Sequence, residues 1–192
     1  MKRNIYISYI HSDAMNFKFK IMDRFKGRKY KFSNEEYDVN VLDFEKNEES
    51  LFKLEKKVSH SDVTIVLISK NILESKWIFE EVKASLETQT PSGRVKPPKG
   101  VIGVVIPEKG NDYSYIMSKG SKGIWRVDKE KLPSLMSANM HNEVLMQNKN
   151  DVSYDSFISV YRWEDFIGNF DNCVNIAYEK ANESLEEYSI TK

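Results

Sequence analysis

The sequence predicts an α/β fold in which a doubly wound, flavodoxin-like, five-stranded parallel sheet carries helices on both faces. Short apolar segments alternate with amphipathic, charged segments between residues 4 and 107, and this strand–helix alternation is typical of a parallel sheet. The third apolar segment, "DVTIVLIS", is apolar toward both faces, as expected of a strand that is covered on each side.

The expected strands are rich in β-branched and aromatic residues, which favour the extended conformation. They span residues 4–9, 37–44, 62–69, 100–107 and 156–163. Between and after them, apolar residues recur at helical spacing. The expected helices span residues 11–27, 45–60, 74–87 and 164–188.

Two of these helices carry more specific expectations. Ser75 is placed to cap the third helix, and Phe79, Val82 and Leu86 form the stripe that we expect to pack on the sheet. The closing helix presents one apolar face. Its residues are Phe166, Phe170, Val174, Ala177 and Ala181.

The length of 192 residues fits one domain, residues 1–192. Residues 1–107 hold the core strand–helix units, and residues 158–188 hold the last strand and the closing helix. Residues 108–157 lose this periodicity and are low in apolar content, so we expect an inserted, partly irregular segment with one short helix.

Composition excludes several classes of function. Lysine plus arginine equals aspartate plus glutamate, 29 each, so no basic excess points to a nucleic-acid partner. No apolar run approaches the roughly 20 residues that cross a membrane. The one cysteine, Cys173, forms no internal disulfide, which favours a reducing compartment. We therefore expect a cytoplasmic protein with no nucleic-acid or membrane partner.

Familiar catalytic and cofactor motifs are absent from the sequence. It has no glycine-rich dinucleotide fingerprint, no P-loop and no G-x-S-x-G nucleophile elbow. His11, His60 and His141 lack the spacing of a metal site, so we expect no metal. A response-regulator receiver would need an aspartate where this chain has Ser69.

One acid lies where a parallel sheet binds its ligands, just beyond the carboxyl end of the third strand. Trp77 and Glu81 are four residues apart in the helix that follows, so they share one face. Acids near a helix N-terminus are also stabilised by the helix dipole, and spacing alone favours this structural explanation for Glu81.

The chain resembles the TIR (Toll/interleukin-1 receptor) domain family in two stretches. "NIYISYIHSD" is similar to the opening strand of that family, and "SDVTIVLISKNILESKWIFEEV" is similar to its third-strand region, with the W-x-x-x-E pattern on Trp77 and Glu81. The later "ISVYRWEDFI" resembles TIR proteins of bacterial Thoeris anti-phage defence. TIR domains often follow "SY" with basic residues, and this chain has Ile10 and His11 there.

The resemblance implies an enzyme that consumes NAD, with Glu81 as the catalytic residue. It implies that Ser8, Tyr9, His11, Ser69 and Trp77 contact the substrate, that NAD is substrate rather than cofactor, and that no metal is needed. Thoeris proteins imply a cyclic or modified ADP-ribose signal that reaches a separate effector protein. A phage-derived trigger and assembly into a homo-oligomer are further implications.

Two other functions remain open from the sequence. One is a non-enzymatic TIR module that acts by protein interaction. The other is an enzyme like the nucleoside deoxyribosyltransferases, which share the α/β plan and use a carboxylate nucleophile.

Overall fold

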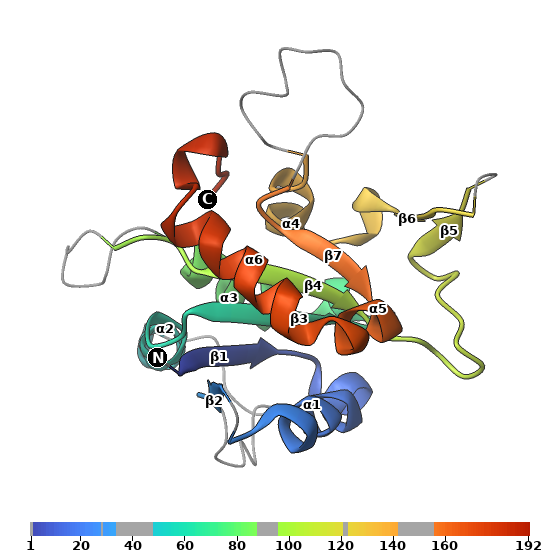
Figure 1. Ribbon diagram of the computed structural model, residues 1–192, viewed down its shortest axis with the longest axis horizontal. Helices are drawn as coiled ribbons and strands as arrows, with labels where there is room; N and C mark the ends of the chain where they lie inside the picture. Colours follow the sequence, from blue (N-terminus) through green and yellow to red (C-terminus); the bar gives the residue numbers. More distant parts are fainter. Residues whose placement is uncertain (1, 28, 34–47, 88–95, 121–122, 142–155) are drawn as a thin grey trace.

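The computed structural model describes residues 2–27, 29–33, 48–87, 96–120, 123–141 and 156–192. Its main sheet has five parallel strands in the spatial order β2-β1-β3-β4-β7 (Figure 1). These strands are β1 (Arg3–Ser8), β2 (Tyr30–Phe32), β3 (Val63–Ile68), β4 (Gly100–Val105) and β7 (Ser159–Arg162). Counted within this sheet, the order is 2-1-3-4-5, which is the flavodoxin-like order. The predicted fold class is confirmed.

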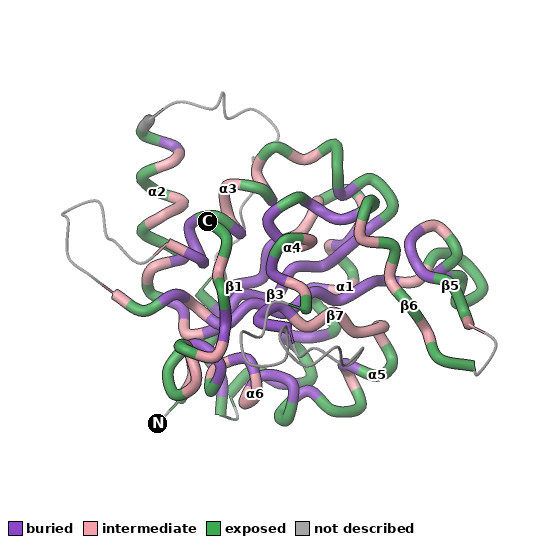
Figure 2. Tube along the Cα trace, turned by 90° about the horizontal axis from the view of Figure 1, so that it is seen from above, coloured by how far each residue is buried: buried purple, intermediate pink, exposed green. Residues whose placement is uncertain are grey.

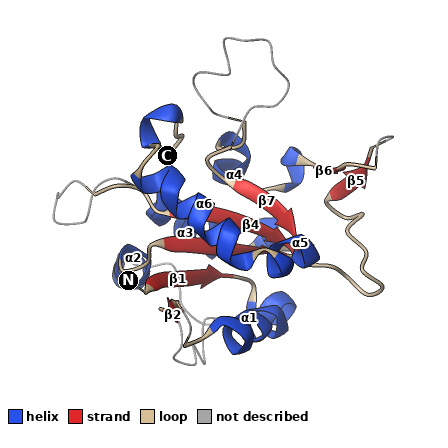
Figure 3. Cartoon of the chain, in the orientation of Figure 1, coloured by secondary structure: helices blue, strands red, loops and turns tan. Residues whose placement is uncertain are grey.

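Helices cover both faces of the sheet (Figure 3). They are α1 (His11–Phe25), α2 (Glu48–Ser59), α3 (Lys76–Leu86), α4 (Ser134–Ala138), α5 (Trp163–Gly168) and α6 (Phe170–Asn182). The first, α1, packs with α5 and α6 on one face, whereas α2, α3 and α4 lie on the other. Short 3-10 turns are η2 (Ile72–Glu74), η3 (Lys129–Lys131) and η4 (Leu185–Glu187).

The core follows from the alternation of side chains along the strands. Ile5 and Ile7 of β1 point into the cluster formed with α1, α5 and α6. Tyr6 points to the opposite face, where it packs with Val58 of α2 and Ala84 of α3. The central strands are buried along their whole length (Figure 2). This two-sided burial is what the apolar third segment predicted.

The second strand differs from its prediction. The expected strand at residues 37–44 lies outside the described residues. The strand that pairs with β1 in the structure is Tyr30–Phe32, seven residues earlier at its start. Tyr30 and Phe32 are both buried, and the exposed Lys31 alternates with them. Only three residues long, this strand is too short to give a clear alternating pattern in the sequence.

The buried stripe of α3 is offset by one residue from the prediction. Ser75 caps the helix as expected, because its side chain accepts from the Ile78 amide. Val82 and Leu86 are buried, but Phe79 is 37% exposed and Ile78 takes the predicted place of Phe79 in the core. Successive helical residues are rotated by about 100°, so Ile78 and Phe79 cannot both face the sheet.

The predicted closing helix is broken into α5 and α6. The break falls at Asn169, whose φ of −124° and ψ of 28° are not helical. Its amide still bonds to the carbonyls of Asp165 and Phe166, which ends α5. Glycine and asparagine both favour such a break, and Gly168 precedes Asn169. The predicted apolar face is confirmed, since all five of its residues are buried.

The inserted segment is more ordered and more apolar than predicted. It contains an antiparallel pair, β5 (Met117–Lys119) and β6 (Trp125–Val127), and the expected short helix is α4. Several of its side chains join the core cluster beneath α3. They are Tyr113, Ile116, Met117, Leu132, Leu135 and Met136. The described part of the insertion is therefore an integral part of the domain.

A buried asparagine joins the insertion to the C-terminal tail. Asn139 is fully buried, and its side chain donates to the carbonyls of Leu135 and Thr191 while accepting from the Thr191 amide. The Ile158 amide donates to the Asn139 carbonyl. This one residue thus holds α4, the approach to β7 and the tail together.

Replacing Gly100 by alanine should destabilise the fold. A Cβ at this position would lie 2.3 Å from the Ala177 carbonyl oxygen of α6, so the helix would have to move away from β4. Overpacking of this kind costs about 1–3 kcal/mol. The measurement is denaturant unfolding of Gly100→Ala beside Gly168→Ala, where an added Cβ meets nothing within 4 Å. Equal stability of the two variants would contradict the close approach.

Alkaline pH should loosen the insertion through Tyr115. Its hydroxyl lies 2.8 Å from the Ile68 carbonyl oxygen and 2.7 Å from that of Ile106, and burial raises its pKa. A raised pKa in the folded state means that stability is complete below the ordinary value near 10 and falls as the pH rises above it. Unfolding measured from pH 8 to 12 should therefore show a steeper loss in the wild type than in Tyr115→Phe. Parallel curves would refute this role for the phenol.

Candidate functional site

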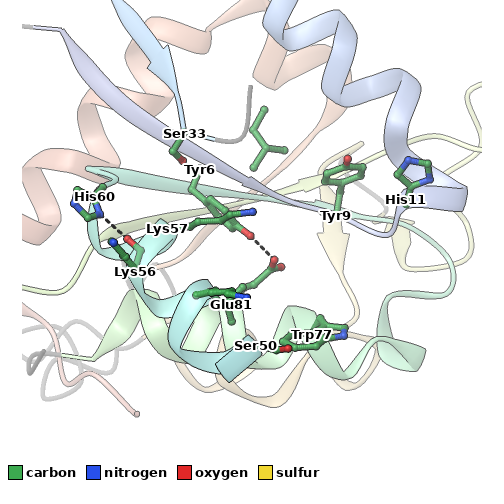
Figure 4. A pocket seen from close by; sticks show the side chains of 13 residues that line it. Tyr6, Tyr9, His11, Ser33, Ser50, Lys56, Lys57, His60, Trp77 and Glu81 are labelled. Carbon is green, nitrogen blue, oxygen red and sulfur yellow. Dashed lines mark hydrogen bonds between the residues drawn. The ribbon is translucent and has the colours of Figure 1, made fainter. Parts of the chain in front are cut away.

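A pocket of about 550 Å³ lies between β1, α2 and α3 (Figure 4). Its carboxyl-edge end is lined by Tyr9, by His11 at the start of α1 and by Trp77 in the first turn of α3. From there the pocket follows α2 toward His60, which precedes β3 at the amino edge of the sheet. Glu81 and Tyr6 line its middle.

Two hydroxyl groups of β1 hold the Glu81 carboxylate. Tyr6 Oη donates to Oε1 at 2.5 Å, and Ser8 Oγ donates to Oε2. Tyr6 is 5% and Ser8 1% exposed, so both donors are fixed by the surrounding structure. They lie two residues apart on one face of the strand, and each reaches one oxygen of the same carboxylate. This pair of contacts orients Glu81 toward the pocket.

A second polar contact fixes the helix that carries Glu81. The Ser85 hydroxyl donates to the Glu81 carbonyl at 2.8 Å and lies 2.8 Å from the Thr64 hydroxyl of β3. Thr64 and Ser85 are both fully buried. Together with the Ser75 cap and the buried Ile78 stripe, this contact sets the rotation of α3 about its own axis. The rotation places Trp77 and Glu81 on the pocket side.

Four of the predicted site residues line this pocket, namely Glu81, Trp77, Tyr9 and His11. The rings of Tyr9 and His11 lie 6.2 Å apart between centroids. Ser8 is not among the lining residues, but it reaches the site through its hydrogen bond to Glu81. The structure brings these five residues together around the pocket.

Ser69 lies outside the group. Its hydroxyl donates to Asp13 at 2.8 Å, and Asn71 donates to the same carboxylate oxygen at 3.1 Å. Ser69 is buried and does not line the pocket. Its position after β3 was read correctly, but the first turn of α1 takes its hydroxyl. Among the described residues, Ser69 ties α1 to β3.

Besides Ile7 and Ser33, the prediction missed two groups of pocket residues. Tyr6 was overlooked, although the alternation of β1 places it on the same face as Ser8. The other group comes from α2 and the residue after it. Its members are Ser50, Lys53, Leu54, Lys56, Lys57 and His60. Most of them are three or four residues apart, which places them on one face of the helix.

The comparison with known families decides the identity of the domain. A sequence model described as the TIR domain matches residues 5–131, which is more than half of the chain. The chain belongs to the TIR domain family. The matched region covers most of β1 and all of β3 and α3, and so includes Tyr6, Ser8 and Glu81.

One similar solved structure contains TIR domains from an assembly described as the activated Roq1 resistosome directly recognizing the pathogen effector XopQ. It shares 22% sequence identity with this chain, covers 55% of it and aligns with a TM-score of 0.35. The match spans 58% of that other chain, so this chain covers less than two thirds of its relative's length.

No cluster of three or more histidine, cysteine, aspartate or glutamate side chains within the described ranges could hold a metal ion. Among the helices placed by the structure, none is both long and apolar enough to cross a membrane.

Proposed function

We propose that this TIR domain is an enzyme that cleaves the bond between nicotinamide and ribose in NAD, with Glu81 as its catalytic residue. The observation that carries the proposal is the placement of the Glu81 carboxylate in the pocket, with Tyr6 and Ser8 each donating to one of its oxygens. A carboxylate has about four lone-pair sites, so these two hydrogen bonds do not by themselves exhaust its acceptor capacity.

The chemistry suits a single carboxylate. When the bond breaks, its electron pair stays with nicotinamide, which leaves as a neutral pyridine, so no general acid is required. Positive charge grows on the ribose, as in the oxocarbenium-like transition state of glycoside cleavage. A carboxylate that is already oriented stabilises this charge without reorganising. Glu81 would also accept hydrogen bonds from the ribose hydroxyls.

The attacking group decides the product. Water adds a hydroxyl to the ribose and releases one proton, which gives ADP-ribose. A nitrogen or hydroxyl of the same ligand gives a cyclic isomer, again with loss of one proton. We favour a cyclic or otherwise modified ADP-ribose that activates a separate effector in anti-phage defence, on the strength of the resemblance of residues 158–167 to Thoeris proteins.

Glu81→Gln should abolish nicotinamide release while the fold is retained. The amide keeps the size of the side chain but removes the charge, and loss of one preorganised electrostatic contact typically costs 100- to 1,000-fold in rate. The measurement is mass spectrometry of NAD reaction products. Glu80→Gln, with the same charge change at a neighbour that does not line the pocket, should remain active.

This experiment also separates the alternative functions. Purified protein and lysates of phage-infected cells are both needed, because TIR enzymes can require a trigger. If Glu81→Gln keeps full biological activity, the domain acts as a non-enzymatic interaction module. If the wild type exchanges bases on nucleosides and leaves NAD intact, it is a transferase. Either result would overturn the proposal.

Tyr6→Phe should lower kcat by about tenfold, because it removes one hydrogen bond to a charged group, worth about 1.5 kcal/mol, from the catalytic carboxylate. The ring remains in the core, so KM for NAD should change by less than about twofold. Tyr178→Phe on α6, far along the chain from the site, is the matched control. A change confined to KM would show that Tyr6 contacts the substrate instead of orienting Glu81.

A further inference from the structure

The charges that line the pocket are unevenly distributed. Its described lining contains three lysines and two histidines, whereas Glu81 is the sole acid among these residues. All three lysines, Lys53, Lys56 and Lys57, come from α2. In Figure 4, Lys56 and His60 lie at one end of the pocket and Tyr9 and His11 at the other, with Lys57 and Glu81 between them. The pocket therefore has a basic end and an aromatic end.

The packing of α2 explains why its lysines face the pocket. Val58 is fully buried and Leu54 is partly buried, and both pack against Tyr6 and Ala84. These contacts fix the rotation of the helix, so that Lys53 and Lys57 flank the buried stripe on the pocket side. Tyr6 thus makes two kinds of contact. Its ring packs against the apolar side of α2, and its hydroxyl donates a hydrogen bond to Glu81.

Simpler explanations account for part of this basic face. Lys56 and Lys57 lie in the last turn of α2, where cations favour the helix dipole. Lys53 pairs with Glu49 at 2.6 Å on the exposed surface. A helix dipole rewards a cation at any position around the last turn, however, and does not explain why both lysines line the cavity that contains Glu81.

We propose that Lys56 and Lys57 bind the diphosphate of the substrate and thereby set its direction in the pocket. This inference rests on the proposed function. The diphosphate is attached to the same ribose whose other end carries nicotinamide. If that ribose lies at Glu81, the diphosphate points along α2 and the nicotinamide lies between Tyr9 and Trp77. Lysine is a common point-charge ligand for phosphate.

The reverse direction is electrostatically unfavourable. The nicotinamide ring of NAD is a cation before the bond breaks, so it would be repelled by the lysines of α2. The diphosphate would then meet Tyr9, His11 and Trp77, at an end of the pocket whose described lining holds no lysine. The basic and aromatic ends of one cavity therefore select a single orientation. The pocket is therefore suited to a ligand whose sugar carries a cationic base at one position and a diphosphate at another.

Binding of inorganic pyrophosphate tests the anion site without any catalysis. Titration calorimetry on the Glu81→Gln protein should give binding that weakens about tenfold in Lys56→Gln/Lys57→Gln. Lys83→Gln, which removes one positive charge from α3 outside the pocket, should stay within about twofold. Lys57→Arg keeps the charge and should retain binding. Pyrophosphate affinity that ignores Lys56 and Lys57 would overturn the inference.

A kinetic comparison tests the direction of the substrate. In the active protein, Lys56→Gln/Lys57→Gln should raise KM for NAD about tenfold. Its kcat/KM for nicotinamide riboside, which has the scissile bond but no phosphate, should be unchanged. An equal loss for both substrates would mean that the lysines act on Glu81 and not on the diphosphate, and would overturn the inference. If the wild type cleaves neither compound, the proposed function fails, and the pyrophosphate titration alone decides whether the anion site exists.

Discussion

The hydrogen bonds from Tyr6 and Ser8 to Glu81 are the contacts on which the pocket depends, because they join β1 to α3 through a charged group. Both the hydroxyl groups and the carboxylate would be destabilising if they were buried without a hydrogen-bond partner. A buried hydroxyl without an acceptor costs about 1–3 kcal/mol, and a partly buried carboxylate needs donors at both oxygens. The three side chains therefore satisfy one another, and the same contact that stabilises the domain aims the carboxylate. Stability and the proposed chemistry are coupled at this point.

The rest of the structure prepares this contact from both sides. On the strand side, β1 is held in register by β2 and β3, so Tyr6 and Ser8 emerge on one face at fixed height. On the helix side, the pair Thr64 and Ser85 fixes α3 against β3 one turn beyond Glu81. A short polar bridge inside an otherwise apolar layer specifies one rotation of a helix more sharply than apolar packing does, because hydrogen bonds have narrow geometry.

Local patterns in the sequence predicted the features that depend on neighbouring residues, such as helical faces and helix caps. Helical spacing put Trp77 and Glu81 on one face, Ser75 was recognised as a cap, and the strand order followed from the alternation of elements. The contacts of Glu81 with Tyr6 and Ser8 were not predicted, because these residues are 75 and 73 positions away in the sequence and nothing local indicates which strand residue meets which helix residue. The bond from the Ser69 hydroxyl to Asp13 was not predicted for the same reason, because Asp13 belongs to a different element.

The lysines of α2 show a further limit of sequence patterns, because a basic helical face looks the same whether it meets water or a cavity. Burial of Leu54 and Val58 against Tyr6 decides between the two. A pocket that was basic throughout would repel a sugar as it becomes cationic, and one that was acidic throughout would repel a diphosphate. Because Lys56 and Glu81 lie at different places along the pocket, each charge can act on its own part of one ligand. The lysines and Glu81 can then act on the same ligand, because Tyr6 connects them. Its ring packs against α2, which carries the lysines, and its hydroxyl donates to Glu81.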